Sequence, residues 1–213
     1  MIEIRHKETG KVLHRIDGDT LRGCKLKCID LRGADFQNQD LSGCTMSGCS
    51  LSEADLRTAH LSKAKINNCV IQRGDFTNAN LTEADLSDNV LDVSKFIRVN
   101  AKGSKFRHSK INGADLTGGC FDNADFFFCE LRSNCTGASM VEANLFGADM
   151  SNADFTRADL RKSTMTDGKI LGAKFEYAKM KDSIGTNGQP WGFTIKSTQP
   201  KRPWWQIWSR AAV

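Results

Sequence analysis

Long apolar runs are missing from this chain of 213 residues. No stretch approaches the roughly 20 consecutive apolar residues of a transmembrane helix, which argues against a membrane-spanning protein. The first ten residues, MIEIRHKETG, contain no apolar signal core, so we expect a cytoplasmic protein whose cysteines stay reduced. Charged residues make up 26% of the chain and hydrophobic residues 39%. This balance argues against an intrinsically disordered chain.

Histidine is also scarce, with four residues in the whole chain. His6 and His14 lie near the N-terminus, whereas His60 and His108 are far from them and from each other. The chain contains no P-loop, HExxH motif, nucleophile elbow or spaced set of zinc ligands. We therefore predict a protein that is not an enzyme and that needs no metal or cofactor.

Large apolar side chains are present in a regular series, at every fifth position from Ile16 to Met180. One residue is missing from this spacing within the segment 132–139. The series has 34 positions, and only Ala101 and Thr136 are not large apolar residues. Such regularity cannot arise by chance, so the five-residue period decides the architecture.

A small residue stands two positions before most of the large ones, and Asp or Asn often lies between, as in Ala34-Asp35-Phe36. Cysteine serves as this small residue at five positions, Cys24, Cys44, Cys49, Cys69 and Cys129. We interpret these cysteines as small buried packing residues. A redox or metal site is the alternative, but the CKLKC segment at 24–28 does not have CxxC spacing.

Neither an α-helix nor a β-strand brings residues five apart to the same face. Five helical residues turn through about 500°, which misses the starting face by about 140°, and strand residues five apart point in opposite directions. A backbone that turns a corner every five residues does meet the requirement. Four such sides make a coil of 20 residues with a square section, and coils stack about 4.8 Å apart. The 34 positions then predict about 8.5 coils and a rod roughly 40 Å tall.

The A(D/N)LXX pattern of residues 16–180 resembles the repeats of the pentapeptide-repeat family. The resemblance implies an all-β fold, a right-handed quadrilateral β-helix. Residues 1–15 alternate around the turn signal Glu8-Thr9-Gly10, which predicts a β-hairpin that caps the N-terminal end of the rod. The shortened segment 132–139 is interpreted as a tolerated irregularity, with a hinge or a recognition feature as the alternative.

The repeats stop after Met180, and residues 181–213 hold all three prolines and all four tryptophans. Trp204 and Trp208 are four residues apart, a spacing that suits a short amphipathic helix, and with Trp205 they are candidate contact residues. Three roles are open for this tail: a cap on the last coil, a homodimer contact, or contact with a membrane interface. An exposed rod end needs cover, which favours the first two, and gyrase-binding members of the resembled family imply the dimer contact.

The net charge of +5 lies at the two ends of the chain, with +2 on residues 1–15 and +4 on residues 181–213. Residues 16–180 carry −1. The resembled family includes members that confer fluoroquinolone resistance by mimicking DNA and binding DNA gyrase, so the resemblance implies this role as a possibility to test. DNA carries about one negative charge per 1.7 Å of axis, which a nearly neutral rod does not reproduce. The charge therefore argues against DNA mimicry, although the width of the rod still suits a topoisomerase.

Cations gather within most of one predicted coil, between residues 95 and 110, where no acidic residue occurs. This basic belt consists of Lys95, Arg98, Lys102, Lys105, Arg107 and Lys110. Acidic residues precede and follow it, so that bands of opposite charge would attract between coils. Because a belt around a rod is not a one-sided patch, we favour this structural role over binding of nucleic acid or an acidic partner.

Phe127 and Phe146 break the rule that a polar residue follows each large apolar one. They are predicted to stack on consecutive coils, flanked by Phe128, with Arg107 one coil earlier as a cation–π end. An exposed aromatic strip of this kind often marks an interaction site; cover by the tail or by the loop at 132–139 is the alternative. We predict a non-enzymatic protein-interaction or scaffold protein, with a topoisomerase-protection protein and a peripheral membrane protein as alternatives.

Overall fold

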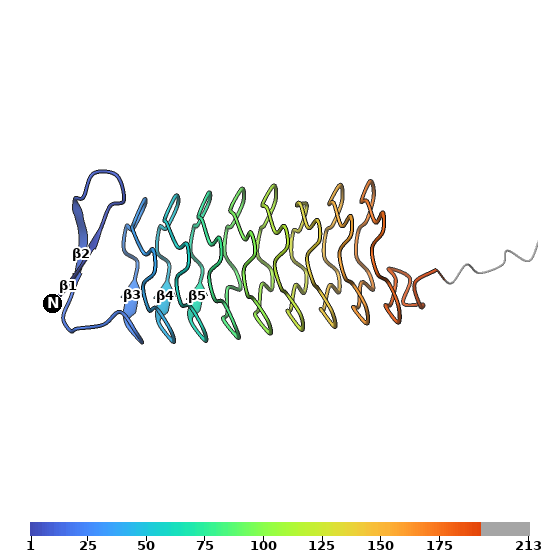
Figure 1. Ribbon diagram of the computed structural model, residues 1–213, viewed down its shortest axis with the longest axis horizontal. Helices are drawn as coiled ribbons and strands as arrows, with labels where there is room; N and C mark the ends of the chain where they lie inside the picture. The colour runs from blue at the N-terminus through green and yellow to red at the C-terminus, as the bar shows by residue number, and fades with distance from the viewer. Residues whose placement is uncertain (193–213) are drawn as a thin grey trace, which may run out of the picture.

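The computed structural model describes residues 1–192 as an N-terminal hairpin followed by a straight stack of coils (Figure 1). The hairpin consists of β1 (Ile2–Arg5) and β2 (Val12–Ile16), which pair antiparallel. Three short strands on successive coils pair in parallel in the order β3-β4-β5, namely β3 (Lys25–Lys27), β4 (Thr45–Ser47) and β5 (Lys65–Asn67). The described residues contain no helix, and the predicted all-β class is confirmed.

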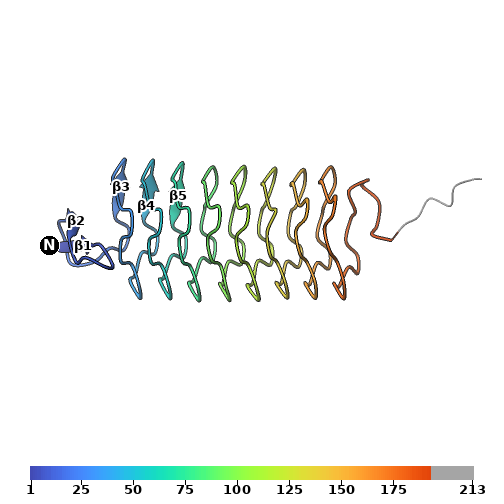
Figure 2. The same cartoon turned by 90° about the horizontal axis from the view of Figure 1, so that it is seen from above.

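Each side of a coil pairs with the side twenty residues further along the chain. Asp35 pairs with Asp55, and Asp55 with Asp75, through single parallel bridges. The same offset recurs around the coil, and two perpendicular views show the coils repeating along one axis (Figures 1 and 2). Most sides are too short to form a named strand because the chain turns again within five residues. The stack is the β-solenoid that the five-residue period predicts.

The boundary between hairpin and coils lies slightly later than the sequence indicates. Ile16, predicted as the first position of the repeats, instead pairs with Ile2 at the end of β2. The hairpin then closes the backbone of the first coil. The Lys7 N–H donates to the Gly33 carbonyl at 2.8 Å, and the Asp35 N–H donates to the Arg5 carbonyl at 2.8 Å. The hairpin thus supplies the partners that a preceding coil supplies elsewhere.

The Asp or Asn before each large apolar residue shapes the corner that follows. Its side-chain oxygen accepts the N–H of the residue two positions later, as Asp85 does from Ser87 at 3.1 Å and Asp154 from Thr156 at 2.9 Å. The next residue then takes a left-handed conformation, as in Asp88 with φ of 59°, which Asn, Asp and Gly tolerate best. Turn chemistry therefore accounts for the D/N position of the repeat.

Acidification is expected to weaken the rod through these carboxylates. The Arg57 side chain that donates to Asp55, and the Thr156 that donates to Asp154, are the main groups that hold the pKa of these two carboxyls below the usual value. A carboxyl with a lowered pKa stabilises the fold above its unfolded pKa of about 3.9, and the stabilisation is lost as the pH falls through the folded pKa. We expect a lower urea midpoint at pH 3 than at pH 7.

Asp55→Asn provides the control for this pH dependence because the amide oxygen can still accept the corner N–H but does not ionise over this range. The midpoints of this variant at the two pH values should lie closer together than those of the wild type. Equal midpoints in the wild type would show that the corner carboxylates contribute nothing to the pH dependence of folding.

The core is a narrow column of large side chains that leaves no room for a substrate. The large positions from 21 to 165 are at most 4% exposed. Phenylalanine rings fill the middle of the column, and Phe106 stacks on Phe126 at 5.0 Å between ring centroids. Ala101 is completely buried, and Val99, in the neighbouring small position, is 2% exposed. The two positions have exchanged large and small side chains, so that the core volume is kept.

The shortened coil differs in detail from the sequence prediction. Bridges join residues 20 apart up to Lys110 and Glu130, 19 apart from the Asp115–Asn134 pair to the Glu130–Asp149 pair, and 20 apart again after that. The missing residue therefore lies in the corner directly after position 131. As a result Cys135, which is fully buried, occupies the inward position assigned to Thr136 in the sequence. That assignment was wrong because neither residue is large and apolar, so the five-residue pattern cannot distinguish them.

Polar side chains form a buried ladder along one column of small positions, Cys49, Cys69, Asn89, Ser109 and Cys129. Asn89 is 1% exposed. Its Oδ1 accepts the Cys69 N–H at 2.7 Å, and its Nδ2 donates to the carbonyls of Ile66 at 2.5 Å and Leu86 at 2.8 Å. The Sγ of Cys69 likewise accepts the Cys49 N–H at 3.3 Å. These cysteines therefore pack and also accept or donate hydrogen bonds, a role that the sequence interpretation missed.

Candidate interaction surface

Four aromatic side chains meet on one corner of three consecutive coils. We call this cluster the aromatic corner: His108, Phe127, Phe128 and Phe146. The rings of Phe127 and Phe146 stack with centroids 5.6 Å apart and planes 13° from parallel, and Phe128 meets Phe127 edge-on at 4.7 Å. Phe128 is 51% exposed, whereas Phe127 and Phe146 are half-buried. The rings form one continuous apolar patch on a surface that is otherwise mostly polar.

The repeat itself explains why these rings come together. Phe127 and Phe146 are the first corner residues of successive coils, and they align because the 19-residue step compensates for the missing residue. The Phe128 N–H donates to the Phe146 carbonyl at 3.0 Å, and Phe128 has a φ of 50°. A Cβ atom at Gly147 would lie 2.8 Å from the Phe128 ring. Glycine at this position therefore lets the ring lie over the backbone of the next coil.

Arg107 does not form the cation–π end that the sequence predicts. Its Nε and terminal nitrogen instead bind the Asp125 carboxylate, which is a stronger partner for a guanidinium group than an aromatic face. The imidazole of His108 meets the rings in its place, edge-on to Phe127 at 5.6 Å and nearly parallel to Phe128 at 6.2 Å. The sequence did contain a signal for His108, because it precedes Phe128 by one coil of 20 residues.

The loop at 132–139 leaves the aromatic corner open, since Phe128 remains half exposed. A polar hollow of about 390 Å³ lies at the corner just after position 131. Asn134 in this hollow already donates to Thr117 at 3.0 Å, and Arg132 pairs with Asp149 at 3.3 Å. These groups satisfy one another, which fits the tolerated irregularity better than a recognition feature.

The basic belt is tied to the acidic coils on both sides of it. Lys95 pairs with Asp75 at 3.8 Å, and Lys110 pairs with Glu130 at 3.9 Å. With the Arg107 ion pair, three of the six belt cations bind carboxylates of neighbouring coils. These pairs are partly exposed and contribute little stability each. They do support the structural role of the belt over a free surface for nucleic acid.

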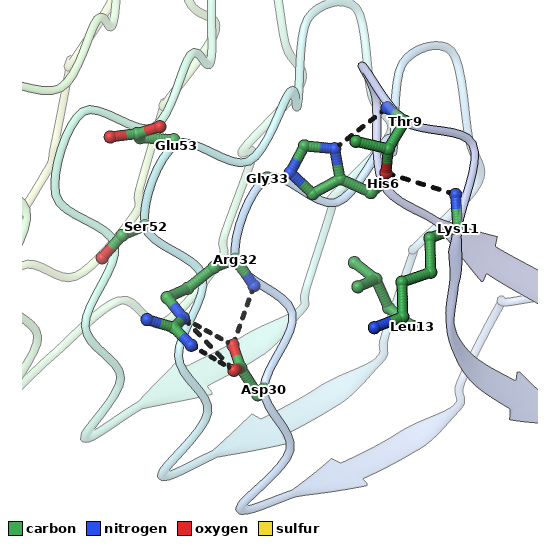
Figure 3. Close-up of a pocket in the computed structure, with 9 residues that line it drawn as sticks. All are labelled: His6, Thr9, Lys11, Leu13, Asp30, Arg32, Gly33, Ser52 and Glu53. Carbon is green, nitrogen blue, oxygen red and sulfur yellow. Dashed lines mark hydrogen bonds and ion pairs between the residues drawn. The ribbon is translucent and has the colours of Figure 1, made fainter.

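A second hollow, of about 560 Å³, lies between the hairpin and the first corners (Figure 3). The His6 Nδ1 in this hollow accepts the Glu8 N–H at 3.1 Å, and the imidazole lies over Gly33. The Arg32 side chain folds back on Asp30 at 2.7 Å (Figure 3). These polar groups therefore bind partners within their own element, His6 and Glu8 in the hairpin and Arg32 and Asp30 in the first coil.

The described residues 1–192 contain no group of three or more His, Cys, Asp or Glu side chains that could hold a metal ion. All eight cysteines are free thiols. Burial raises the pKa of the Cys129 and Cys135 thiols, which keeps them protonated. The remaining predicted contact residues, Trp204, Trp205 and Trp208, lie outside the described residues.

Comparisons with known sequences and structures place the repeats in a family. A profile described as a pentapeptide repeat region matches residues 20–96, and one for pentapeptide repeats matches 94–126 and 132–167. No curated protein is significantly similar to the chain in sequence. HetL, a pentapeptide repeat protein involved in heterocyst differentiation regulation in the cyanobacterium Nostoc sp. strain PCC 7120, is 19% identical, with 79% of this chain and 92% of HetL covered and a TM-score of 0.51.

A second solved structure is full-length QnrB1, a plasmid-mediated fluoroquinolone resistance protein. It is 19% identical, with 74% of this chain and 91% of QnrB1 covered and a TM-score of 0.38. The likeness to HetL shows a shared fold, and the lower similarity to QnrB1 carries no functional argument.

Proposed function

Because this chain belongs to the pentapeptide-repeat family, we propose that it is a non-enzymatic protein-interaction protein that holds a protein partner against its rigid rod. The observation that carries this proposal is the aromatic corner. Three phenylalanine rings and one imidazole form a continuous patch over three coils. Exposed aromatic clusters are energetically costly to keep in water and are enriched where proteins bind proteins.

The charges around the aromatic corner favour a protein over a nucleic acid. On the adjoining side Lys110 pairs with Glu130, and the charge of Arg107 is neutralised by Asp125. Nucleic acid binding needs an uncompensated basic surface. The same near-neutral surface argues against the topoisomerase alternative, because mimicry of DNA needs an acidic one. We propose the cytoplasm as its location, where free thiols persist.

We also propose that the coil is right-handed, as the family resemblance implies, and that the rod has about 8.5 coils, as the number of repeats implies. Among the described residues, no helix is long and apolar enough to cross a bilayer. Peripheral membrane contact would rest on the tail alone, and homodimer formation through the tail remains an alternative to capping.

A photo-crosslinking experiment tests the proposed docking surface. With benzoylphenylalanine at position 128, we expect a discrete covalent adduct with one partner protein after irradiation of cells. The matched control carries the same photoreactive residue at Arg73, an exposed corner position with φ of 57° far from the aromatic corner. The adduct should form at 128 and not at 73. Identical adduct patterns at the two positions would contradict the proposal.

Replacing Phe127 and Phe146 together by serine separates binding from folding. We expect the 128 adduct to disappear while the free energy of unfolding falls by about 2–4 kcal/mol, the loss of one aromatic pair together with the burial of two half-buried rings. Thermal unfolding measures the second quantity. A much larger drop in melting temperature would mean that the rings serve mainly to stabilise the rod.

A further inference from the structure

The C-terminal end of the rod is incompletely covered within the described residues. Ile170, Phe175 and Met180 occupy the last large positions and are only half-buried, whereas the large positions from 21 to 165 are at most 4% exposed. Leu171 and Tyr177 in the same coil are each 84% exposed. These five residues define the end face. Its three large positions, Ile170, Phe175 and Met180, form an apolar surface that the repeat would normally cover with another coil.

The backbone at the end face is also open. In the interior, the N–H of each large residue donates to the next coil, as the Leu160 N–H does to the Lys179 carbonyl at 2.8 Å. Within residues 1–192, no backbone acceptor is found for the N–H groups of Ile170, Phe175 and Met180. Such an edge is a template for further pairing, and proteins generally cover it.

The chain already begins to cover the end face at residues 184–191. After the last coil it turns back, and an antiparallel bridge joins Ile184 to Pro190. The Trp191 N–H donates to the Ser183 carbonyl at 2.8 Å, and the indole lies 4.9 Å from the Phe175 ring. One tryptophan of the C-terminal region therefore covers one residue of the end face.

We propose that residues 193–213 of the same chain complete this cover, with Trp204, Trp205 and Trp208 packed on the end face. The segment continues directly from Gly192, which lies beside that face, and its 21 residues can span it several times over at roughly 3.3 Å per residue. Its three indoles match the apolar surface left open. This cover does not involve the aromatic corner, and it makes the tail the counterpart of the N-terminal hairpin.

Amide hydrogen exchange of the full-length protein tests this inference. In one variant Trp204, Trp205 and Trp208 are replaced by serine; in the matched control Lys201, Arg202 and Arg210 are replaced by serine. We expect exchange in residues 170–182 to accelerate at least about tenfold in the tryptophan variant only. Exchange in residues 56–81 should remain unchanged in both variants, which verifies that the rod stays folded.

Two results would overturn the proposal. Unchanged exchange in 170–182 of the tryptophan variant would show that the indoles do not cover the end face. Protection that increases with protein concentration, together with a dimer mass in light scattering, would assign the end face to a second copy of the chain. A protein that stays monomeric at every concentration and responds only to loss of the tryptophans is the expected result.

Discussion

Phe106→Ala should lower the free energy of unfolding by about 3–5 kcal/mol, the typical cost of removing a buried phenylalanine. Phe106 is 1% exposed, and its ring lies 5.0 Å from Phe126, 5.8 Å from Phe96 and 6.1 Å from Phe121. The cavity cannot collapse easily, because hydrogen bonds fix the spacing of every coil. Each coil contacts only its neighbours, so a defect in the middle weakens the junction between two halves of the rod.

Equilibrium unfolding in urea measures this effect, with Phe128→Ala as the matched control. Phe128 is the same residue type one coil away, but it is 51% exposed and packs against the aromatic corner and over Gly147. Its removal should cost about 1–2.5 kcal/mol, from its ring contacts and the buried half of its surface. If the two substitutions were equally costly, the buried column would not be the main source of stability.

Asn89→Ala is expected to lower the free energy of unfolding by about 1–3 kcal/mol, because it leaves buried backbone groups without partners. Asn89 is the acceptor for the Cys69 N–H and a donor to the Ile66 carbonyl. The substitution also leaves a small cavity at a site that is 1% exposed. Urea unfolding measures the loss, and amide exchange at Cys69 should accelerate beyond the change in global stability.

Asn89→Ser is the control that the fold itself suggests. Ser94 occupies an equivalent small position, where its Oγ accepts the Gly74 N–H at 3.2 Å and donates to the Ile71 carbonyl at 2.8 Å. Serine at position 89 should therefore retain most of the stability that alanine loses. Equal losses for serine and alanine would indicate that the volume of Asn89 matters and its hydrogen bonds do not.

The candidate site shows where sequence reasoning succeeds and where it ends. The 20-residue coil aligns Phe127 with Phe146 from their positions alone, because the repeat fixes which residues share a corner. The same reasoning could not choose between two partners for Arg107, a phenyl face or the Asp125 carboxylate, since both lie one coil away. It overlooked His108 because an isolated histidine at a corner looks like any other polar corner residue.

The position of the missing residue near 131 is likewise not fixed by the sequence pattern alone. The five-residue spacing indicates that one residue is absent between 131 and 140, but several alignments of the intervening segment fit equally well. Only the change of bridge offset from 20 to 19 residues places the deletion and brings Cys135 inward. A cysteine is small enough to lie in either kind of inward position, so its type carries no information about register.

The sequence by itself determined the coil, its 20-residue stacking and the identity of nearly every core residue. It could do so because a corner every five residues is a local property, and the pattern recurs too many times to arise by chance. Only the tertiary structure decided how the polar side chains pair, including the buried ladder through Asn89 and the ion pair of Arg107 with Asp125. Those choices depend on distances between neighbouring coils and on competition among several partners within reach. A pattern along one chain does not encode that competition.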